Sequence, residues 1–403
     1  MVPRALYDAG LLAGMVTDLW MGGGLARLGR FAPTTPLKAA FSRYHSDLKY
    51  ASVRSSPFQA LKGSVGSIFH PRRDCSDRYN EYCQVGSRYA SGVASVLGDQ
   101  KWLSEGRMFF GYDTCSLETF AVTKSYGLKN VLGQTDPCRT EIEMVQQEEK
   151  EWPHFVTEPL IVPDVFYDRH HAEWEAADNI VVNSSFSEAA LIQQGVDPLK
   201  ISVVPLAYEN QDHRNCQDFA STIELPKSFD FKRPLNVLFL GQVMLRKGIQ
   251  YLLTAADSMR SLPVQFNIVG PVLISEAGIR SAPSNVRFHG RVSRQETQEW
   301  YRSADLYILP TLSDGFALTQ LEAMAHGLPV ISTPNCGEVV QQGVNGQIVP
   351  ARSADAIVSA LTNYLDKPEL LLTHSQSAIP RSRDFSKQAL ADHLQTIATN
   401  MIG

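Results

Sequence analysis

Two adjacent cations stand in a glycine-bounded loop that follows a short apolar run. The loop reads Gly241-Gln-Val-Met-Leu-Arg-Lys-Gly248, and a segment with helical spacing comes directly after it. Glycines let the backbone approach a ligand closely, and the N-terminus of a helix favours an anion. Together with Arg246 and Lys247, these features suit a diphosphate. A solvated turn with two surface cations fits this loop equally well.

A second loop carries two carboxylates and another helix start. It runs from Thr311 to Gly327 and contains Asp314 and Glu322. Glu322 stands among apolar residues, and because burying an unpaired charge is expensive, it either faces solvent or binds hydrogen-bond donors such as sugar or ribose hydroxyls. The amides of residues 315–318 form an anion site that would oppose the cations of the first loop. The alternative is that Asp314 only caps the helix.

The composition is that of an ordinary folded protein. The 403 residues favour two domains, and the 44% hydrophobic and 20% charged residues exclude collagen-like, low-complexity and broadly disordered chains. A net charge of -5 argues against nucleic acid as the main partner. No Cys-x-x-Cys pair occurs, so a reducing cytoplasm is expected. No apolar run reaches the ~18 residues that span a bilayer, so neither a membrane helix nor a signal peptide is expected.

Alternating strands and helices position both loops in the second half of the chain. Ser293 with Glu296 three residues later predicts a capping box at the start of one helix. Such alternation implies a parallel sheet covered on both faces, with ligands at the carboxyl ends of its strands. The expected strands are 235–241, 264–270, 285–290, 305–310 and 329–333, and the expected helices are 247–256, 293–304 and 317–326.

The first half has a fainter rhythm of the same kind, which predicts a second α/β domain. Its expected strands are 107–111, 128–133, 179–183 and 201–205. The chain opens on a helical pattern, so the first strand lies elsewhere or the start is late. We expect an N-terminal domain over 1–205, a linker over 206–234, a second domain over 235–375, and over 376–403 a helix that packs back toward the first domain.

The second half resembles the family-4 retaining glycosyltransferases of the GT-B fold (glycosyl transferases group 1). That family has Gly-Arg-x-x-x-x-Lys-Gly where this chain has residues 241–248. It also has Glu-x(7)-Glu and then Ala-Met-Ala-x-Gly-x-Pro-Val-Ile, where this chain has Asp314 to Glu322 and then Ala323-Met-Ala-His-Gly-Leu-Pro-Val-Ile331. Roughly residues 235–365 are covered. The resemblance implies the α/β GT-B fold, in which two Rossmann-like, doubly wound parallel-sheet domains face each other across a cleft.

The resemblance also implies an activity and a set of contacts. A hexose-type sugar would pass, with retention, from a nucleotide diphosphate-sugar, UDP- or GDP-linked, to a glycan or lipid-linked acceptor. Arg246 and Lys247 would stabilise the leaving diphosphate. Glu322 would bind the ribose and Asp314 the transferred sugar. No Asp-x-Asp occurs, so we expect no metal and no cofactor. Further donor contacts are expected from Gly241, Gln242, Gly270, Arg291, Val292, Gly315, Phe316, Ala317, Leu318 and Thr319.

Three positions depart from the family pattern. Gln242 replaces the first arginine of the phosphate loop, and Asp314 replaces the first glutamate. The family often has a histidine near the sugar after a strand of its N-terminal domain, where this chain reads Gly133-Gln-Thr-Asp-Pro137. Gln134 or Asp136 would take that place, and Asp136 joins Arg246, Lys247 and Asp314 as a catalytic candidate.

Other features of the first half have simpler interpretations. Asp113 follows a strand and is expected to be a turn aspartate. His170-His-Ala-Glu173 lacks a third ligand, so we expect a polar surface there and no metal site. Basic and aromatic residues alternate over 27–62, which predicts peripheral contact with the inner face of a membrane, or else a solvated face over an aromatic core.

Two alternatives to a glycosyltransferase stay open. A sugar-nucleotide epimerase or hydrolase on the same fold would act on the donor without an acceptor. A catalytically silent nucleotide-sugar-binding or partner subunit would keep the pocket without turnover. Gln242 and the missing histidine favour this silent subunit, whereas retention of Lys247 and Glu322 speaks against it.

Overall fold

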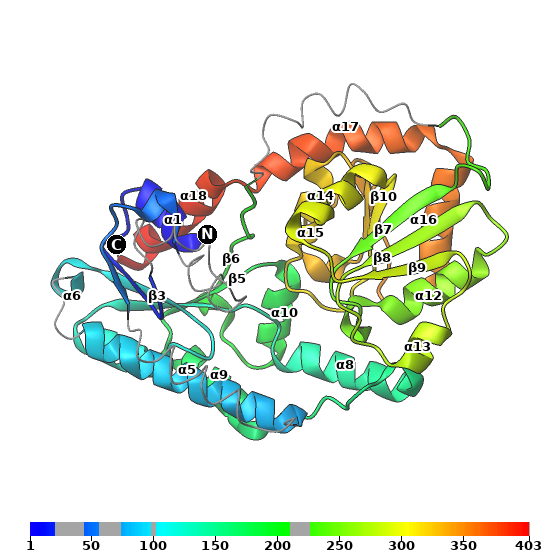
Figure 1. Cartoon of the computed structure of the whole chain (residues 1–403). Helices are drawn as coiled ribbons and strands as arrows, with labels where there is room; N and C mark the ends of the chain where they lie inside the picture. Colours follow the sequence, from blue (N-terminus) through cyan, green and yellow to red (C-terminus); the bar gives the residue numbers. More distant parts are fainter. Residues whose placement is uncertain (21–43, 56–73, 98–101, 210–225, 403) are drawn as a thin grey trace, which may run out of the picture.

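The computed structural model describes residues 1–20, 44–55, 74–97, 102–209 and 226–402. These residues form two α/β halves that lie side by side (Figure 1). Each half is built on parallel strands. The expected architecture of two Rossmann-like domains is therefore confirmed. Within the expected linker, residues 210–225 lie outside the described residues.

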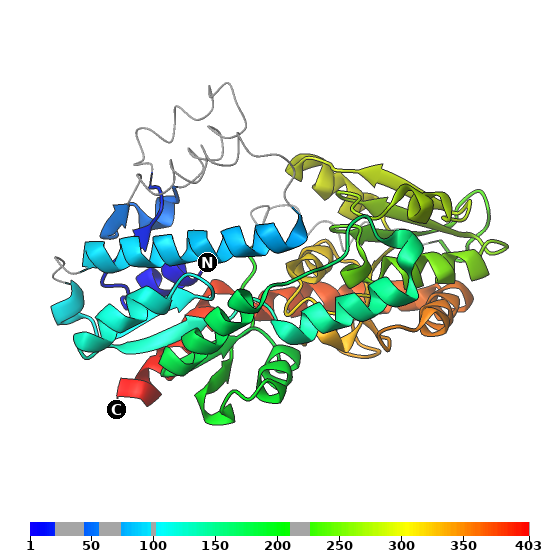
Figure 2. The ribbon, with the colours of Figure 1, turned by 90° about the horizontal axis from the view of Figure 1, so that it is seen from below.

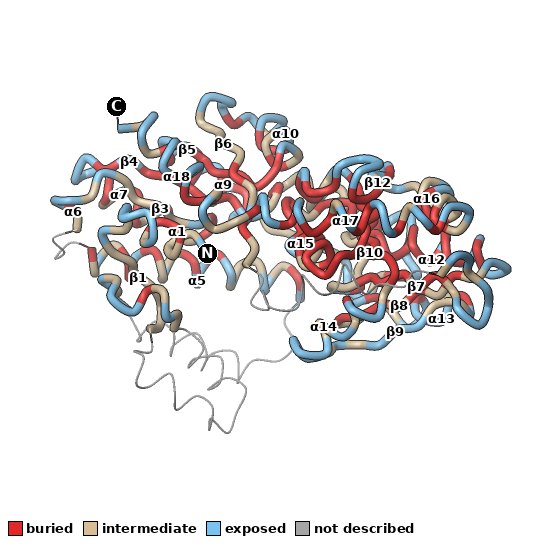
Figure 3. The backbone as a smooth tube through the Cα atoms, turned by 90° about the horizontal axis from the view of Figure 1, so that it is seen from above, coloured by how far each residue is buried: buried red, intermediate tan, exposed pale blue. Residues whose placement is uncertain are grey.

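The C-terminal half is built on a six-stranded parallel sheet with the order β12-β11-β10-β7-β8-β9. Its central strands are rich in Val, Leu, Ile and Phe and are buried, as expected for a sheet covered on both faces (Figure 3). The strand order reverses between β7 and β10, and ligands of such sheets bind at this reversal. The strands are β7 (Leu235–Leu240), β8 (Val264–Val269), β9 (Val286–Gly290), β10 (Leu306–Leu309), β11 (Val330–Ser332) and β12 (Gly346–Ile348).

Helices cover both faces of this sheet. Figure 1 shows α14 and α15 on one side of it and α12 and α16 on the other. The predicted capping box is confirmed: the Ser293 hydroxyl accepts the Glu296 amide at 3.3 Å, and Glu296 Oε2 accepts the Ser293 amide at 2.7 Å. The helices are η5 (Leu245–Lys247), α12 (Ile249–Ser258), α13 (Glu276–Arg280), α14 (Arg294–Ser303), α15 (Leu318–Ala325), η6 (Pro334–Cys336), α16 (Ala354–Asp366) and α17 (Glu369–Asp384).

The N-terminal half has a four-stranded parallel sheet with the order β3-β4-β5-β6. Its strands are β3 (Met108–Tyr112), β4 (Lys129–Gly133), β5 (Asn179–Val182) and β6 (Ile201–Val203). Helices α5 (Cys75–Leu97), α6 (Trp102–Glu105), α7 (Leu117–Ser125), α8 (Arg139–Glu151), η3 (Pro153–Phe155), α9 (Asp164–Ala176), α10 (Ser185–Gln193) and η4 (Pro198–Lys200) accompany it.

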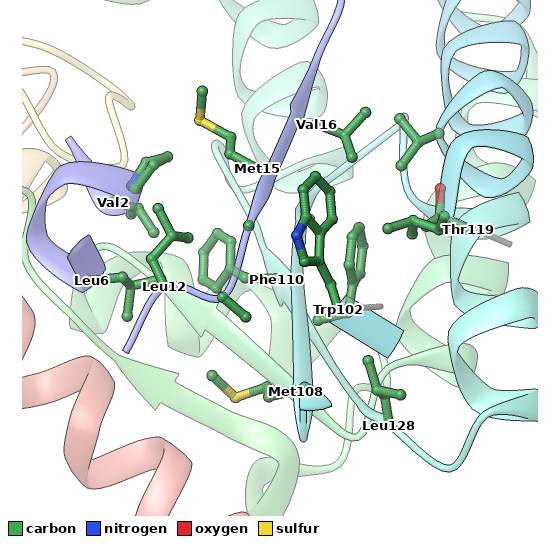
Figure 4. Close-up of a pocket in the computed structure, with 18 of the residues that line it drawn as sticks. Val2, Leu6, Leu12, Met15, Val16, Trp102, Met108, Phe110, Thr119 and Leu128 are labelled. Atoms are coloured by element: carbon green, nitrogen blue, oxygen red, sulfur yellow. The ribbon is translucent and has the colours of Figure 1, made fainter. Parts of the chain in front are cut away.

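The chain begins with a helix, and its first strand comes after it. Helix α1 (Val2–Asp8) precedes β1 (Met15–Thr17), which pairs in parallel with β2 (Val53–Ser55), and η2 (Ser46–Leu48) lies between them. A cavity of about 610 Å³ separates this small sheet from β3. Its lining is mainly apolar, with Trp102 at the centre of the labelled side chains (Figure 4).

Two helices carry the chain from one half to the other. Helix α18 (Lys387–Ile402) follows α17 and packs on α1, where Lys387 pairs with Asp8 at 2.5 Å (Figure 1). Helix α8 runs from the N-terminal sheet to the C-terminal half, and Figure 2 shows it from below. Phe155, just after α8, is buried in the core of the C-terminal half. Among the described residues, no helix is long and apolar enough to cross a membrane.

Candidate active site

The two loops singled out in the sequence meet at the reversal of the C-terminal sheet. Arg246 and Lys247 lie in η5 after β7, and Asp314 lies in the loop after β10. Lys247 forms an ion pair with Asp314. Arg246 Nη1 lies 3.4 Å from Asp314 Oδ1 and donates to the Ser313 carbonyl at 3.0 Å. Three of the four catalytic candidates thus lie in direct contact.

A glycine makes this approach of the loops feasible. Gly248 ends η5 with a φ of 73°, in the left-handed region that favours glycine. A Cβ at this position would lie 1.9 Å from the carbonyl oxygen of Pro310, the residue after β10. Only a residue without a side chain therefore lets the loop after β7 pack on the end of β10.

The N-terminal half contributes a carboxylate that the sequence did not single out. Glu141, in the first turn of α8, accepts a hydrogen bond from the Ser313 hydroxyl at 2.7 Å and lies 3.3 Å from Arg246 Nη1. The one signal in the sequence was its place just after the strand-end loop of residues 133–137. Arg246 therefore lies between carboxylates of both halves.

Burial and ion pairing act in opposite directions on the two cations. Burial lowers the pKa of Lys247, and the charge of Asp314 offsets only part of this effect. Burial also lowers the pKa of Arg246, but the charges of Glu141 and Asp314 outweigh it, and the net shift is upward. An anionic ligand would therefore compete with Asp314 and Glu141 for both cations.

The start of α15 differs from the expected row of amides. The Ala317 amide donates to the Cys336 carbonyl at 3.1 Å, so it is engaged within the protein. No side chain caps α15, which excludes Asp314 as its cap. The Thr319 hydroxyl accepts a hydrogen bond from Tyr307 at 2.7 Å. Phe316 is buried, whereas Leu318 is exposed.

Gly315 lies at the boundary between the halves. Its φ is 43°, and a Cβ there would lie 2.9 Å from the side-chain oxygen of Asn183, at the end of β5. Close by, the Ser185 amide donates to Glu338 at 3.1 Å. The loop that carries Asp314 therefore touches the N-terminal half directly.

Glu322 is held by a tyrosine. The hydroxyl of the buried Tyr301 donates to Glu322 Oε2 at 2.9 Å. Burial raises the pKa of Glu322, and this hydrogen bond opposes the shift. Of the two alternatives for Glu322, exposure to solvent or contact with hydrogen-bond donors, the structure shows the second in part: the carboxylate is half-buried and has a donor from its own chain.

The remaining donor candidates lie at the carboxyl ends of β7, β8 and β9. The Gly241 amide donates to the Val269 carbonyl at 3.0 Å, and a Cβ on Gly270 would lie 1.9 Å from the Gly241 carbonyl oxygen. Gln242 and Arg291 are exposed and Val292 is half-buried. Gly270, Arg291 and Val292 follow β8 and β9, which lie on the side of β7 away from β10.

Asp136 lies in an ordered loop at the end of β4. Its Oδ1 accepts the Cys138 amide at 2.8 Å. Burial, together with the charges of Asp113 and Glu141, raises the pKa of Asp136 to about 7. This carboxyl therefore gains or loses its proton near neutral pH, which is the property that a general acid or base needs.

Asp113 fixes that loop and is more than a turn residue. It is 4% exposed and accepts hydrogen bonds from the Gln134 side chain at 2.9 Å and from the Thr135 amide at 3.1 Å. Trp174 Nε1 donates to Gln134 Oε1 at 2.8 Å. Gln134 is therefore bound within the N-terminal half, whereas Asp136 is half-buried near the boundary.

The expectation of a polar surface at residues 170–173 is wrong for His170 and Glu173, although His171 is exposed. His170 is 1% exposed and its Nε2 lies 3.8 Å from Asp113 Oδ2, while Glu173 is 0% exposed. Glu173 accepts the amides of Thr114, Ser116 and Leu117 at 2.6, 2.9 and 3.1 Å, so it fills the anion site at the start of α7. Among the described residues, no group of three or more His, Cys, Asp or Glu side chains is placed to hold a metal ion.

The predicted membrane-facing region falls mostly outside the described part of the chain. Residues 27–43 and 56–62 lie outside the described residues. Between them, Lys49, Tyr50 and Arg54 are exposed.

Comparison with known proteins identifies the C-terminal half. Residues 234–367 match the family model "Glycosyl transferases group 1". The likeness to this family therefore lies within the C-terminal half. The matched residues include every donor-site candidate named above, from Gly241 to Glu322.

Curated relatives match over part of their length. A D-inositol 3-phosphate glycosyltransferase of Streptomyces griseus is 29% identical over 39% of this chain and 39% of its own length. An uncharacterized 41.2 kDa protein in the cps region of Klebsiella pneumoniae is 25% identical over 46% of this chain and 52% of its own. The chain thus spans about half, or less, of the length of these relatives.

Solved structures extend the likeness in fold to the whole chain. Sucrose-phosphate synthase from Thermosynechococcus elongatus superposes with a TM-score of 0.62 at 17% identity, over 99% of this chain and 91% of that one. Anabaena HepE in complex with UDP superposes with a TM-score of 0.58 at 14% identity, over 96% of this chain and 100% of that one. The two halves together therefore have the GT-B fold.

Proposed function

We propose that this chain is a retaining, metal-independent glycosyltransferase that moves a hexose-type sugar from a nucleotide diphosphate-sugar to a hydroxyl of a glycan or lipid-linked acceptor. The observation that carries the proposal is the contact of Arg246 and Lys247 with Asp314 at the reversal of the C-terminal sheet. UDP is the first candidate for the nucleotide, because Anabaena HepE was solved with UDP and with UDP-glucose.

The chemistry follows from where the charges lie. In the transfer, the bond between the anomeric carbon and the diphosphate oxygen breaks, and a bond to the acceptor oxygen forms. The acceptor's hydroxyl proton passes to the departing diphosphate. Arg246 and Lys247 stabilise the negative charge that grows on that group, so two side-chain cations do the work that a metal ion does elsewhere. Once the diphosphate holds Lys247, Asp314 is released to bind hydroxyls of the transferred sugar.

Two other carboxyls complete the proposed site. Glu322, oriented by Tyr301, binds ribose hydroxyls. Asp136 comes from the opposite half, and because burial raises its pKa to about 7 it can hold a proton near the reacting atoms, while the acceptor's own proton passes to the diphosphate. Each half would thus contribute to one reaction centre.

The test is a calorimetric and thermal-shift titration with UDP, GDP, ADP and their sugar conjugates. Wild type is compared with Lys247→Ala and Glu322→Ala, and with Lys232→Ala, an exposed lysine of the same half, as the control. A ligand at a hundredfold excess over its Kd stabilises the native state by about 2.7 kcal/mol. We expect one nucleotide family to stabilise wild type and the control, and both site variants to lose most of the effect.

Three results would contradict parts of the proposal. If wild type and both site variants bound the nucleotide equally well, Lys247 and Glu322 would not be part of the donor site. Nucleotide binding without turnover of any donor would favour a silent binding subunit. Release of sugar from the donor at the same rate with and without acceptors would favour a hydrolase.

Peripheral membrane contact through residues 27–62 is proposed from the sequence alone. Basic residues near anionic lipid add about 1 kcal/mol each. Flotation with vesicles that contain phosphatidylserine tests it: the chain should float with these vesicles and remain behind with neutral ones. Failure to float with anionic vesicles would refute it.

A further inference from the structure

A second cavity, of about 280 Å³, adjoins the proposed reaction centre. It lies between the start of α5, one face of α8, the segment after α8, and the loop after β7. Glu141 and Arg246, which contact each other, both line it. A ligand in this cavity would therefore lie next to the residues that we assign to the diphosphate.

The walls of the cavity are largely apolar. Ile142 and Val145 face it from α8 and are both buried. Leu160, Leu273 and Ile274 line it from the segments around them. Such walls suit the apolar face of a ring or the start of an alkyl chain.

The lining of the cavity carries no excess of positive charge. Two cations and three carboxylates line the cavity, so the carboxylates are in excess. The cations are already paired: Arg78 lies 2.7 Å from Glu158, and Arg246 lies 3.3 Å from Glu141. The third carboxylate, Glu149, accepts the Leu160 amide at 2.9 Å. A phosphorylated ligand would have to displace Glu158 from Arg78 or compete with the donor diphosphate for Arg246, whereas a neutral hydroxyl can donate to Glu141.

We propose that this cavity is the acceptor subsite and that it takes an uncharged glycoside with an apolar aglycone. The sugar hydroxyls lie toward Glu141 and Arg246, and the aglycone lies against Ile142 and Val145. The proposal rests on the proposed function, because the cavity is named from its place beside the donor phosphates. It goes further by specifying the charge and the polarity of the acceptor.

The probe is octyl β-D-glucoside below its micelle concentration, with glucose 6-phosphate as the charged comparison. Binding is measured by saturation-transfer NMR and by calorimetry in the presence of UDP, and transfer is measured with UDP-glucose. Val145→Trp fills the cavity. Gln147→Trp adds the same side chain on the exposed face of the same helix and serves as the control. Leu273→Trp, at an exposed position of the lining, serves if Val145→Trp does not fold.

We expect wild type and the Gln147→Trp control to bind the octyl glucoside at least tenfold more tightly than glucose 6-phosphate. The cavity-filling variant should weaken octyl glucoside binding at least tenfold and leave the Kd for UDP within twofold of wild type. The acceptor assignment would be overturned if wild type did not bind octyl glucoside, or bound it more weakly than glucose 6-phosphate. It would also be overturned if the cavity-filling variants bound octyl glucoside as tightly as wild type does. If wild type did not bind UDP at all, the proposed function itself would be overturned.

Discussion

Glu148 provides a sharp test of how α8 is held on the C-terminal half. Its carboxylate is 0% exposed and accepts hydrogen bonds from Gln250 Nε2 at 2.8 Å, the Tyr251 hydroxyl at 2.9 Å and Arg352 Nε at 2.5 Å. Trp152, just after α8, packs edge-on against the Tyr251 ring. Because α8 also carries Glu141, this contact fixes a carboxylate of the N-terminal half beside Arg246.

Glu148→Ala would leave three donors without their acceptor, and these donors differ in their exposure to water. Gln250 and Tyr251 are buried, and a buried unsatisfied donor costs ~1–3 kcal/mol each. The Arg352 side chain is 39% exposed, so water replaces its lost partner. We therefore expect the α8 contact to weaken by about 3 kcal/mol. Arg352→Ala should also weaken it by ~3 kcal/mol, because the buried Glu148 carboxylate keeps two hydrogen-bond donors but loses its cation.

Amide hydrogen exchange of the α8 backbone measures this local opening directly. A loss of ~3 kcal/mol corresponds to a more than hundredfold rise in exchange rate, because ~1.4 kcal/mol is a factor of ten. Glu151→Ala is the control, since Glu151 is exposed on the same helix and accepts a hydrogen bond from Gln147, four residues earlier. The reasoning fails if either Glu148→Ala or Arg352→Ala raises the exchange rate no more than the control does.

Three further predictions concern the site. In urea unfolding, Gly248→Ala should destabilise the chain by ~2 kcal/mol more than Gly343→Ala. Both glycines have a φ near 70° (73° and 71°), but only a Cβ at position 248 would clash with a backbone carbonyl. Equal losses of stability would contradict this reasoning. Asp136 has a pKa raised from 3.8 to about 7, so the native state loses stability as pH rises between these values, and Asp136→Asn should flatten that slope; an unchanged slope would contradict the shift. Tyr301→Phe should raise the pKa of Glu322, because it removes a hydrogen bond that lowers this pKa, and should weaken UDP binding several-fold in calorimetry. An unchanged affinity for UDP would show that Tyr301 does not support the donor site.

The C-terminal half was predictable because its signals are local. The strand at 264–270 and the helix opened by Ser293 need only nearby residues to be recognised, and the structure has both. The loop at 241–248 could be placed for the same reason, since the carboxyl ends of adjacent parallel strands meet at one edge of the sheet. Geometry then brought Lys247 and Asp314 into contact.

Contacts between distant segments could not be predicted in the same way. Glu141 and Glu148 look like solvated charges on a polar helix, and only the packing of α8 on the other half shows their partners. His170 and Glu173 are buried against residues that follow β3, about 57 positions earlier in the chain: Asp113 and the amides at the start of α7. The engaged amide of Ala317 likewise depends on Cys336 of a later loop.

The most direct test of the account is a crystal structure of the chain with UDP bound. The central claim is that the donor diphosphate takes Lys247 from Asp314. We predict Lys247 Nζ within hydrogen-bond distance of the β-phosphate and more than about 4 Å, the limit of an ion pair, from Asp314. UDP bound elsewhere, or bound while the ion pair between Lys247 and Asp314 stays intact, would contradict the claim.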